Sequence, residues 1–158
     1  MSHLVAIYIA ASPGESTRSV PQVLAFPGRG LAGDRYFEGR GTFSPRPMKP
    51  DFEVTLIEEE NLEAFARTSG RPFTAAHARR NLVTTGIRLN DLVNREFSVG
   101  TVRLRGWRLC EPCSHLARIS VPEVLPGLVH LGGLRAQILT AGTLSVGDLI
   151  SCSNSPQS

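Results

Sequence analysis

The stretch Thr101-Val-Arg-Leu-Arg-Gly-Trp-Arg-Leu109 carries the clearest fold signal in this chain. From Val102 to Arg105, apolar side chains alternate with arginines, and a period of two is typical of a strand with one buried face. Gly100 precedes the stretch and favours a turn into it. The sequence therefore predicts a half-buried β-strand at residues 101–109.

Further strands are expected along the whole chain, because short apolar runs are bounded by glycine and proline. They lie at residues 4–9, 20–26, 54–57, 81–85, 92–97, 134–140 and 149–152. A helix is expected from about Glu58, where a run of glutamates favours a helix N-terminus, until Gly70 and Pro72 end it. Strands dominate and no βαβ alternation is evident. This pattern predicts a mainly β fold, a β-barrel or strongly bent sheet with a few short helices.

The length of 158 residues fits one domain with its own core. We expect that domain to span residues 1–152 and the polar tail at residues 153–158 to be disordered. Residues 27–50 are rich in glycine and proline and predict a long loop. Long loops inside compact domains are usually functional or mobile.

The positive charge of the chain comes almost entirely from arginine. Of 17 basic residues Lys49 is the one lysine, and the formal net charge is +3. Arginine binds carboxylates and phosphates through two parallel hydrogen bonds, although a G+C-rich coding sequence would also raise the arginine content. The arginines are scattered and aromatic residues make up only 6%. Because nucleic-acid surfaces cluster basic and stacking side chains, we expect no nucleic-acid partner.

The sequence predicts a cytoplasmic protein that does not contact a membrane. The apolar run at residues 4–11 is too short to span a bilayer and has no basic region before it. Three cysteines are too few for a disulfide-stabilised secreted fold of this length. We therefore expect reduced thiols.

Two cysteines and a histidine lie close together in Cys110-Glu-Pro-Cys113-Ser-His115. A thiolate is both a nucleophile and a soft metal ligand, and nearby arginines favour it. Three explanations stay open. They are a zinc site completed by Cys152 with His115 or His130, thiol–disulfide exchange, or one working cysteine beside a passively packed neighbour.

Two further segments carry candidate binding residues. Gly28-Arg-Gly30-Leu-Ala-Gly33 matches the dinucleotide fingerprint, but the glycines and Pro45 that follow are incompatible with the long helix that the fingerprint requires. The turn Gly33-Asp34-Arg35 presents a carboxylate and a guanidinium together, either to a ligand or to the loop itself. Arg79-Arg80-Asn81 precedes a strand and is either an anion clamp or an ordinary solvated pair.

Taken in order, several segments resemble the MOSC domain, the module named for the C-terminal part of molybdenum-cofactor sulfurases. The resemblance extends from about Leu4 to Cys152, and no single motif carries it alone. The matching segments are Gly30-Leu-Ala-Gly33-Asp34-Arg35, Val54-Thr-Leu-Ile57-Glu58, Arg79-Arg80-Asn81-Leu82-Val83, Cys110-Glu-Pro-Cys113, Gly133-Leu-Arg135-Ala and Leu144-Ser-Val-Gly147-Asp148.

The resemblance implies a MOSC-type β-barrel that binds the molybdenum cofactor, a pterin dithiolene that carries a phosphate. One cysteine near a strand end is the functional thiol of the family, and by position it corresponds to Cys113. That thiol ligates molybdenum in amidoxime-reducing relatives and carries persulfide sulfur in sulfurases. The resemblance thus implies that Cys113 and His115 are catalytic and that Cys113 is the metal ligand. The residues expected to bind the cofactor are Arg79, Arg80, Asn81, Arg118, Arg135, Gly33, Asp34 and Arg35.

Three functions follow as alternatives. The first is a molybdenum-cofactor enzyme that reduces small N-hydroxylated or N-oxide substrates, with electrons from a separate donor protein. The second is a persulfide carrier in cofactor sulfuration, supplied by a separate sulfur donor and without redox chemistry. The third is a zinc-stabilised binding module. Pyridoxal phosphate belongs to the neighbouring domain of the sulfurases and is not expected here, because its Schiff base needs a lysine and the single one, Lys49, lies in a proline-rich loop.

Overall fold

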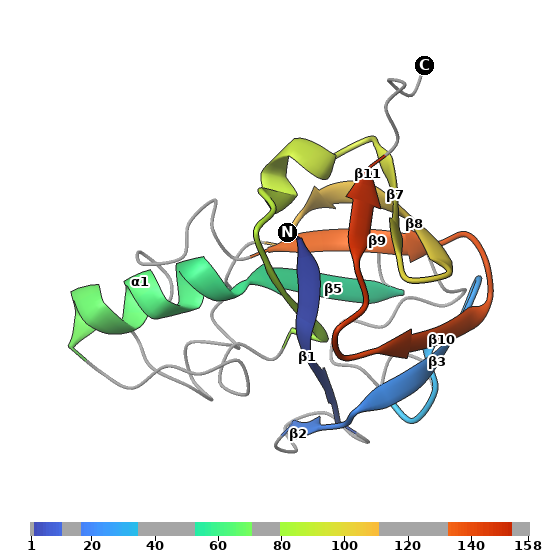
Figure 1. Cartoon of the computed structure of the whole chain (residues 1–158), viewed down its shortest axis with the longest axis horizontal. Helices are drawn as coiled ribbons and strands as arrows, with labels where there is room; N and C mark the ends of the chain where they lie inside the picture. Colours follow the sequence, from blue (N-terminus) through green and yellow to red (C-terminus); the bar gives the residue numbers. More distant parts are fainter. Residues whose placement is uncertain (1, 11–16, 35–52, 71–79, 111–132, 153–158) are drawn as a thin grey trace.

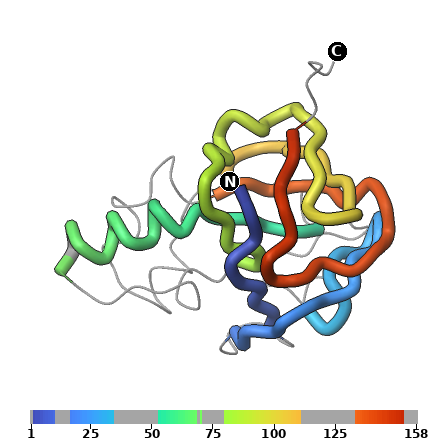
Figure 2. Tube along the Cα trace, viewed as in Figure 1, coloured from blue at the N-terminus to red at the C-terminus, as the bar shows by residue number. Residues whose placement is uncertain are grey.

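The computed structural model of the chain forms one strand-rich body (Figures 1 and 2). It describes residues 2–10, 17–34, 53–70, 80–110 and 133–152. The expected disordered tail and most of the expected loop at residues 27–50 lie outside these ranges.

The described residues contain eleven strands, most of them paired antiparallel. Their bounds are β1 (His3–Ile9), β2 (Arg18–Ser19), β3 (Gln22–Phe26), β4 (Gly30–Leu31), β5 (Val54–Glu58), β6 (Leu82–Thr85), β7 (Glu96–Val99), β8 (Val102–Leu109), β9 (Leu134–Ile138), β10 (Gly142–Ser145) and β11 (Ile150–Cys152). Eight of them form the main sheet, in the spatial order β11-β7-β8-β9-β5-β6-β1-β2. The other three form a smaller sheet in the order β10-β3-β4.

The main sheet curls until its two ends meet. β11 lies at one edge of the strand order and β1 next to the other edge, yet His3 forms a β-bridge with Leu149, just before β11. The Ile150 N–H also donates to the Ser2 carbonyl at 3.0 Å. Figure 1 shows β1 and β11 beside each other at this seam. The predicted mainly β, strongly bent sheet is confirmed.

One α-helix, α1 (Glu59–Ser69), projects from the end of β5 (Figure 1). Glu59 and Glu60 occupy its first turn, where carboxylates favour the helix dipole. Gly70 ends the helix with a left-handed φ of 70° and donates its N–H to the Ala66 carbonyl. The predicted helix and its end are confirmed. None of the described helices is long and apolar enough to cross a membrane.

The expectation that the chain contains no βαβ unit is wrong. β5 and β6 pair in parallel, and α1 lies in the connection between them. Leu62 and Phe65 of α1 are buried, and the helix contacts both strands. Burial of this apolar helix face against the sheet stabilises a parallel pair that strand periodicity alone does not reveal.

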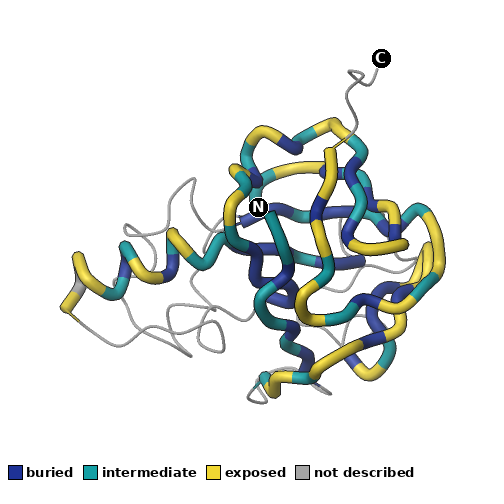
Figure 3. The backbone as a smooth tube through the Cα atoms, in the orientation of Figure 1, coloured by how far each residue is buried: buried dark blue, intermediate teal, exposed yellow. Residues whose placement is uncertain are grey.

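The inner face of the sheet forms the hydrophobic core. In β9, Leu134, Ala136 and Ile138 are buried while the residues between them are partly exposed. In β8, Val102 and Leu104 are likewise buried, which confirms the alternation predicted there. Figure 3 shows buried residues along the middle strands, and exposed residues at the turns and at the end of α1 that is farthest from the sheet. The alternation leaves one face of each central strand free to carry polar side chains.

The strand predicted at residues 92–97 is only partly present. A 3₁₀ helix, η2 (Leu89–Leu92), precedes β7, and the two leucines at its ends are buried. Asn94 adopts a left-handed φ of 64°, which asparagine tolerates, and its N–H donates to the Gly106 carbonyl at 2.9 Å. The strand begins later than predicted because this contact with β8, and not the apolar pattern, decides where pairing starts.

The glycine pattern at residues 28–33 lies at the hairpin between β3 and β4 and opens no helix among the described residues. The Arg29 N–H donates to the Phe26 carbonyl at 3.1 Å. Gly30 has φ 110°, and a Cβ atom there would lie 2.7 Å from the Glu53 carbonyl oxygen. This glycine therefore allows β5 to approach the hairpin. The sequence pattern did not predict β2, β4 or β10, which are short.

Candidate functional site

Five residues from neighbouring segments form a line across the sheet, four through their side chains and Tyr8 through its backbone, and we call this line the polar row. Its members are Tyr8, Asn81, Thr55, Arg135 and Arg108. In the strand register Arg135 lies opposite Thr55 on one side and opposite Arg108 on the other. Directly opposed residues point to the same face of a sheet. The row therefore lies on the face of β5, β9 and β8 that is turned away from the core.

Asn81 joins β5, β1 and the start of β6 through partly buried hydrogen bonds. Its Oδ1 accepts from the Thr55 N–H at 3.1 Å and from the Thr55 hydroxyl at 3.2 Å. Its Nδ2 donates to the Tyr8 carbonyl at 3.1 Å, and its backbone carbonyl accepts from the Tyr8 N–H at 2.7 Å. Asn81 is only 5% exposed. Its first effect is therefore to set the register of β1, β6 and β5 at the row.

Arg80 holds the chain at the point where it leaves the described sheet after β8. Its Nη2 donates to the Cys110 carbonyl at 3.1 Å. The Cys110 N–H donates in turn to the Gly133 carbonyl at 2.7 Å. Cys110 and Gly133, the described residues on either side of the connection at residues 111–132, are therefore adjacent. Cys110 itself is 1% exposed, and its thiol is free of any disulfide. Which of the three explanations holds for the pair stays a prediction, because Cys113 lies outside the described residues.

Three guanidinium groups gather around this connection. Arg135 is two residues after Gly133 and partly exposed, Arg108 is two residues before Cys110 and exposed, and Arg80 is nearly buried. The polar row itself contains two of these cations and no carboxylate. An anion bound beside these two guanidinium groups would be attracted to both. Fixed guanidinium groups also offer paired donors to a phosphate.

Gly33 and Asp34 lie at a different edge of the site. Asp34 is 1% exposed, and its Oδ1 accepts from the Ala10 N–H at 3.1 Å. This bond ties the β4 turn to the chain just after β1, two residues beyond Tyr8 of the polar row. This contact stabilises the loop, which is one of the two alternatives that the sequence left open for Asp34, the other being contact with a ligand. A role of Gly33 and Asp34 in cofactor binding stays a prediction.

The remaining predicted site residues lie outside the described residues: Cys113, His115, Arg79, Arg118 and Arg35. Among the residues that the structure describes, no three His, Cys, Asp or Glu side chains gather as a metal site. The described part of the candidate site therefore contributes arginine and amide side chains, and Cys113, the thiol proposed for its chemistry, lies outside the described residues.

Two glutamates of low exposure flank the ends of β5 but do not belong to the polar row. Glu53 is 3% exposed, and its Oε1 accepts from the backbone N–H groups of Gly28 and Ile138, both at 3.1 Å. Burial raises the pKa of Glu53, and the two hydrogen bonds oppose that shift. Burial likewise raises the pKa of Glu58, whose Oε2 accepts from the Leu89 N–H at 3.3 Å. Both carboxyl groups join β5 to neighbouring elements.

Sequence reasoning missed Tyr8, Thr55 and Arg108 as members of this face. Thr55 has a signal, because it is the one polar residue inside an apolar strand. The periodicity of β8 gives no signal for Arg108, because a bulge between Gly106 and Arg108 inserts an extra residue and shifts the alternation. Tyr8 joins the row through its backbone, which side-chain patterns do not report.

The MOSC domain family model matches residues 44–151 of the chain. A search of curated proteins finds no match to this sequence. The match covers most of the described strands, including β5, β8 and β9, which carry three members of the polar row, and β6, which Asn81 directly precedes.

Solved structures share the whole fold at low sequence identity. The YUAD protein from Bacillus subtilis matches with a TM-score of 0.80 and 16% identity, over 96% of this chain and 96% of that chain. YiiM from Geobacillus stearothermophilus matches with a TM-score of 0.75 and 17% identity, over 98% of this chain and 76% of that chain. YiiM from Escherichia coli matches with a TM-score of 0.72 and 18% identity, over 98% and 71% respectively. These structures show the shared fold, and the family model, which matches more than half of the chain, shows that the chain belongs to the MOSC domain family.

Proposed function

We propose that this MOSC protein binds the molybdenum cofactor at the polar row and reduces N-hydroxylated or N-oxide substrates. The observation that supports the proposal is the gathering of Arg80, Arg108 and Arg135 around the base of the connection that carries Cys113. The family resemblance supplies the expected cofactor, and these cations fit its phosphate.

In this proposal the described residues have two roles: some neutralise and bind the phosphate of the cofactor, and others hold the chain around it in position. Arg135 and Arg108 are accessible to a ligand on the outer face, and their guanidinium groups pair with phosphate oxygens in two parallel bonds. Arg80 is committed to the Cys110 carbonyl and contributes charge while it holds the connection in place. Asn81 positions the ends of β6 and β5 against which the cofactor rests.

The reacting thiol in this proposal is Cys113. Cys110 is sealed in the core, whereas Cys113 follows it by three residues, and three residues of chain span at most about 11 Å. A thiolate is the ligand type that a thiophilic metal prefers. Cys113 would ligate molybdenum, His115 would deliver a proton to the departing oxygen, and the arginines would hold the phosphate.

The reaction is a two-electron reduction. The cofactor, when bound, supplies the redox centre at which the N–O bond of the substrate is cleaved. The balance is one N–OH group, two electrons and two protons consumed, and one N–H group and one water formed. A separate donor protein supplies the electrons.

Metal content tests this proposal directly. Purified full-length protein from a host that makes the cofactor is expected to carry molybdenum near one equivalent, and Cys113→Ser to lose most of it. Cys152→Ser is the matched control, because Cys152 is free and exposed on β11, outside the polar row, and is expected to keep the metal. Equal molybdenum in all three proteins would contradict the role of Cys113.

The two other functions are outcomes of the same measurement. A persulfide carrier would contain cyanolysable sulfur that disappears in Cys113→Ser, without retained metal. A zinc-stabilised module would contain zinc and unfold when a chelator is added.

A further inference from the structure

Trp107 is the extra residue of the bulge in β8. In the register Arg108 lies opposite Arg135 and Gly106 lies opposite the next residue of β9, so Trp107 has no register position of its own. Strict alternation would turn only one of two successive side chains outward, but the bulge leaves both Trp107 and Arg108 exposed. Bulges re-aim side chains and are common next to active sites. This bulge presents an indole beside the polar row.

Two neighbours hold the indole on the outward face. Its Nε1 donates to Gln137 Oε1 at 3.0 Å, and the Arg105 guanidinium carbon lies 5.8 Å from the ring centroid, within the range of a cation–π contact. Gln137 follows Arg135 by two residues on β9, so both side chains lie on one face, roughly 7 Å apart along the strand. With both contacts made, Trp107 is still 39% exposed. A ring of fixed orientation therefore offers exposed surface next to the row.

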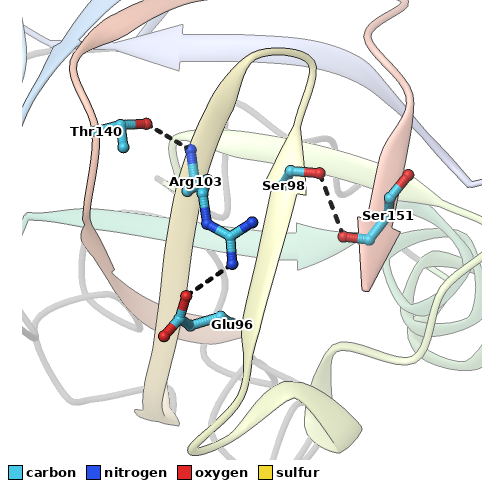
Figure 4. A network of polar contacts seen from close by, with 5 residues as sticks. All are labelled: Glu96, Ser98, Arg103, Thr140 and Ser151. Carbon is cyan, nitrogen blue, oxygen red and sulfur yellow. Dashed lines mark hydrogen bonds and ion pairs between the residues drawn. The ribbon is translucent and has the colours of Figure 1, made fainter. Parts of the chain in front are cut away.

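The end of β8 that is farther from the polar row carries a different set of side chains. Arg103 Nη2 donates to Glu96 Oε1 at 2.7 Å, and the Arg103 N–H donates to Thr140 Oγ1 at 2.9 Å. Figure 4 shows Arg103 lying toward Glu96, and Ser98 bonded to the Ser151 carbonyl on the neighbouring strand. Polar side chains that bond one another cover the sheet there. Single exposed apolar residues are common on proteins, and the place of the indole at the row is what sets it apart.

We propose that Trp107 selects aromatic substrates by stacking on their ring, and this inference rests on the function proposed above. The N–O group of a substrate has to reach the cofactor at the polar row, so the rest of the substrate lies on the surface beside the row. Trp107 lies on that surface, and aromatic rings stack on an indole in offset pairs. Because its neighbours already hold the indole, stacking costs little conformational entropy. The substrate class is N-hydroxylated amidines that carry an aromatic ring.

Tryptophan fluorescence tests the stacking without any reaction. Trp107 is the single tryptophan of the chain, so its emission reports on this ring alone. Full-length wild-type protein is titrated with N-hydroxybenzamidine, and with N-hydroxyacetamidine as the aliphatic control ligand. Saturable quenching is expected with the aromatic compound only, because stacking brings the two rings into contact. Quenching that rises linearly with concentration, or that is equal for both compounds, would reflect collision and would overturn the stacking.

Substrate preference is measured on the molybdenum-loaded protein, with dithionite as the electron source. The ratio of kcat/KM for the aromatic compound to kcat/KM for the aliphatic compound is expected to fall about tenfold in Trp107→Leu. Phe26→Leu is the matched control, because Phe26 is an aromatic residue of similar exposure, 37%, that lies on β3 outside the polar row. It is expected to keep the wild-type ratio. An unchanged ratio in Trp107→Leu would overturn the stacking.

Two further outcomes separate the stacking from the proposed function. If wild-type protein carries molybdenum but reduces neither compound, the proposed function is overturned, and the fluorescence titration still decides whether Trp107 binds an aromatic ring. If Trp107→Leu loses its molybdenum, the indole holds the cofactor and not the substrate, which would overturn the inference. Trp107→Phe serves if leucine prevents folding, and it is expected to keep part of the wild-type ratio because a smaller ring remains.

Discussion

Replacing Asn81 by alanine is the sharpest test of how the polar row is built. The side chain makes three hydrogen bonds, two with Thr55 and one with the Tyr8 carbonyl, between 3.1 and 3.2 Å. Asn81→Ala removes all three hydrogen bonds at once. The Thr55 N–H then loses its acceptor Oδ1, and the Tyr8 carbonyl loses its donor Nδ2. Both groups lie where Asn81 is only 5% exposed, so water replaces it poorly.

The expected loss of unfolding free energy is about 2–4 kcal/mol, because a buried polar group left without its partner costs about 1–3 kcal/mol. For a domain of this size that corresponds to a fall in Tm of roughly 5–15 °C. The bonds link β1, β6 and β5, whose ends meet at the row, so the loss should appear in global unfolding.

Urea unfolding followed by circular dichroism measures this loss. Asn61→Ala is the control. Asn61 lies on α1, and its Nδ2 donates one hydrogen bond to Glu58 Oε2 at 3.3 Å, three residues away in sequence. Alanine suits a helix, so the control should stay within about 0.5 kcal/mol of wild type. The reasoning would be refuted if Asn81→Ala were as stable as Asn61→Ala.

Two further predictions concern stability. Gly133→Ala should destabilise the protein by roughly 3 kcal/mol or more, because the new Cβ would meet the Leu56 carbonyl. Gly147→Ala is the control, because Gly147 also has a positive φ but open space around it, and this change should cost only about 1–2 kcal/mol. Equal melting temperatures of the two variants would contradict the steric argument. Burial raises the pKa of Glu53, so the folded state binds more protons than the unfolded state, and stability should fall as pH rises from the ordinary glutamate range through that raised pKa. Glu53→Gln should flatten this fall in urea titrations between pH 4 and 8, and an unchanged slope would rule Glu53 out as its source.

Much of the fold follows from local patterns. The alternation in β8, the buried apolar run of β5 and the glycine that ends α1 each depend on neighbours in sequence. Such signals indicate which face of a strand is buried and where a helix ends, and the predictions made from them for β8 and α1 are confirmed. They do not report pairing partners, which is why the parallel β5–β6 pair escaped prediction.

The candidate site was predictable in part. The Arg79-Arg80-Asn81 segment and Arg135 were predicted as binding residues. The structure places Asn81 and Arg135 on either side of Thr55 in the polar row, and Arg80 at the Cys110 carbonyl. The contribution of Arg108 depends on the β8 bulge, and that of Thr55 depends on its register with Arg135.

The sequence alone determined that this chain is strand-rich, that its helix ends at Gly70 and that its motifs resemble the MOSC domain. Only the tertiary structure decided that Tyr8, Asn81, Thr55, Arg135 and Arg108 lie side by side. The physical reason is that periodicity is a property of one strand, whereas a row across a sheet exists only after strand order and register are set. Those are fixed by core packing and by hydrogen bonds between segments far apart in the chain.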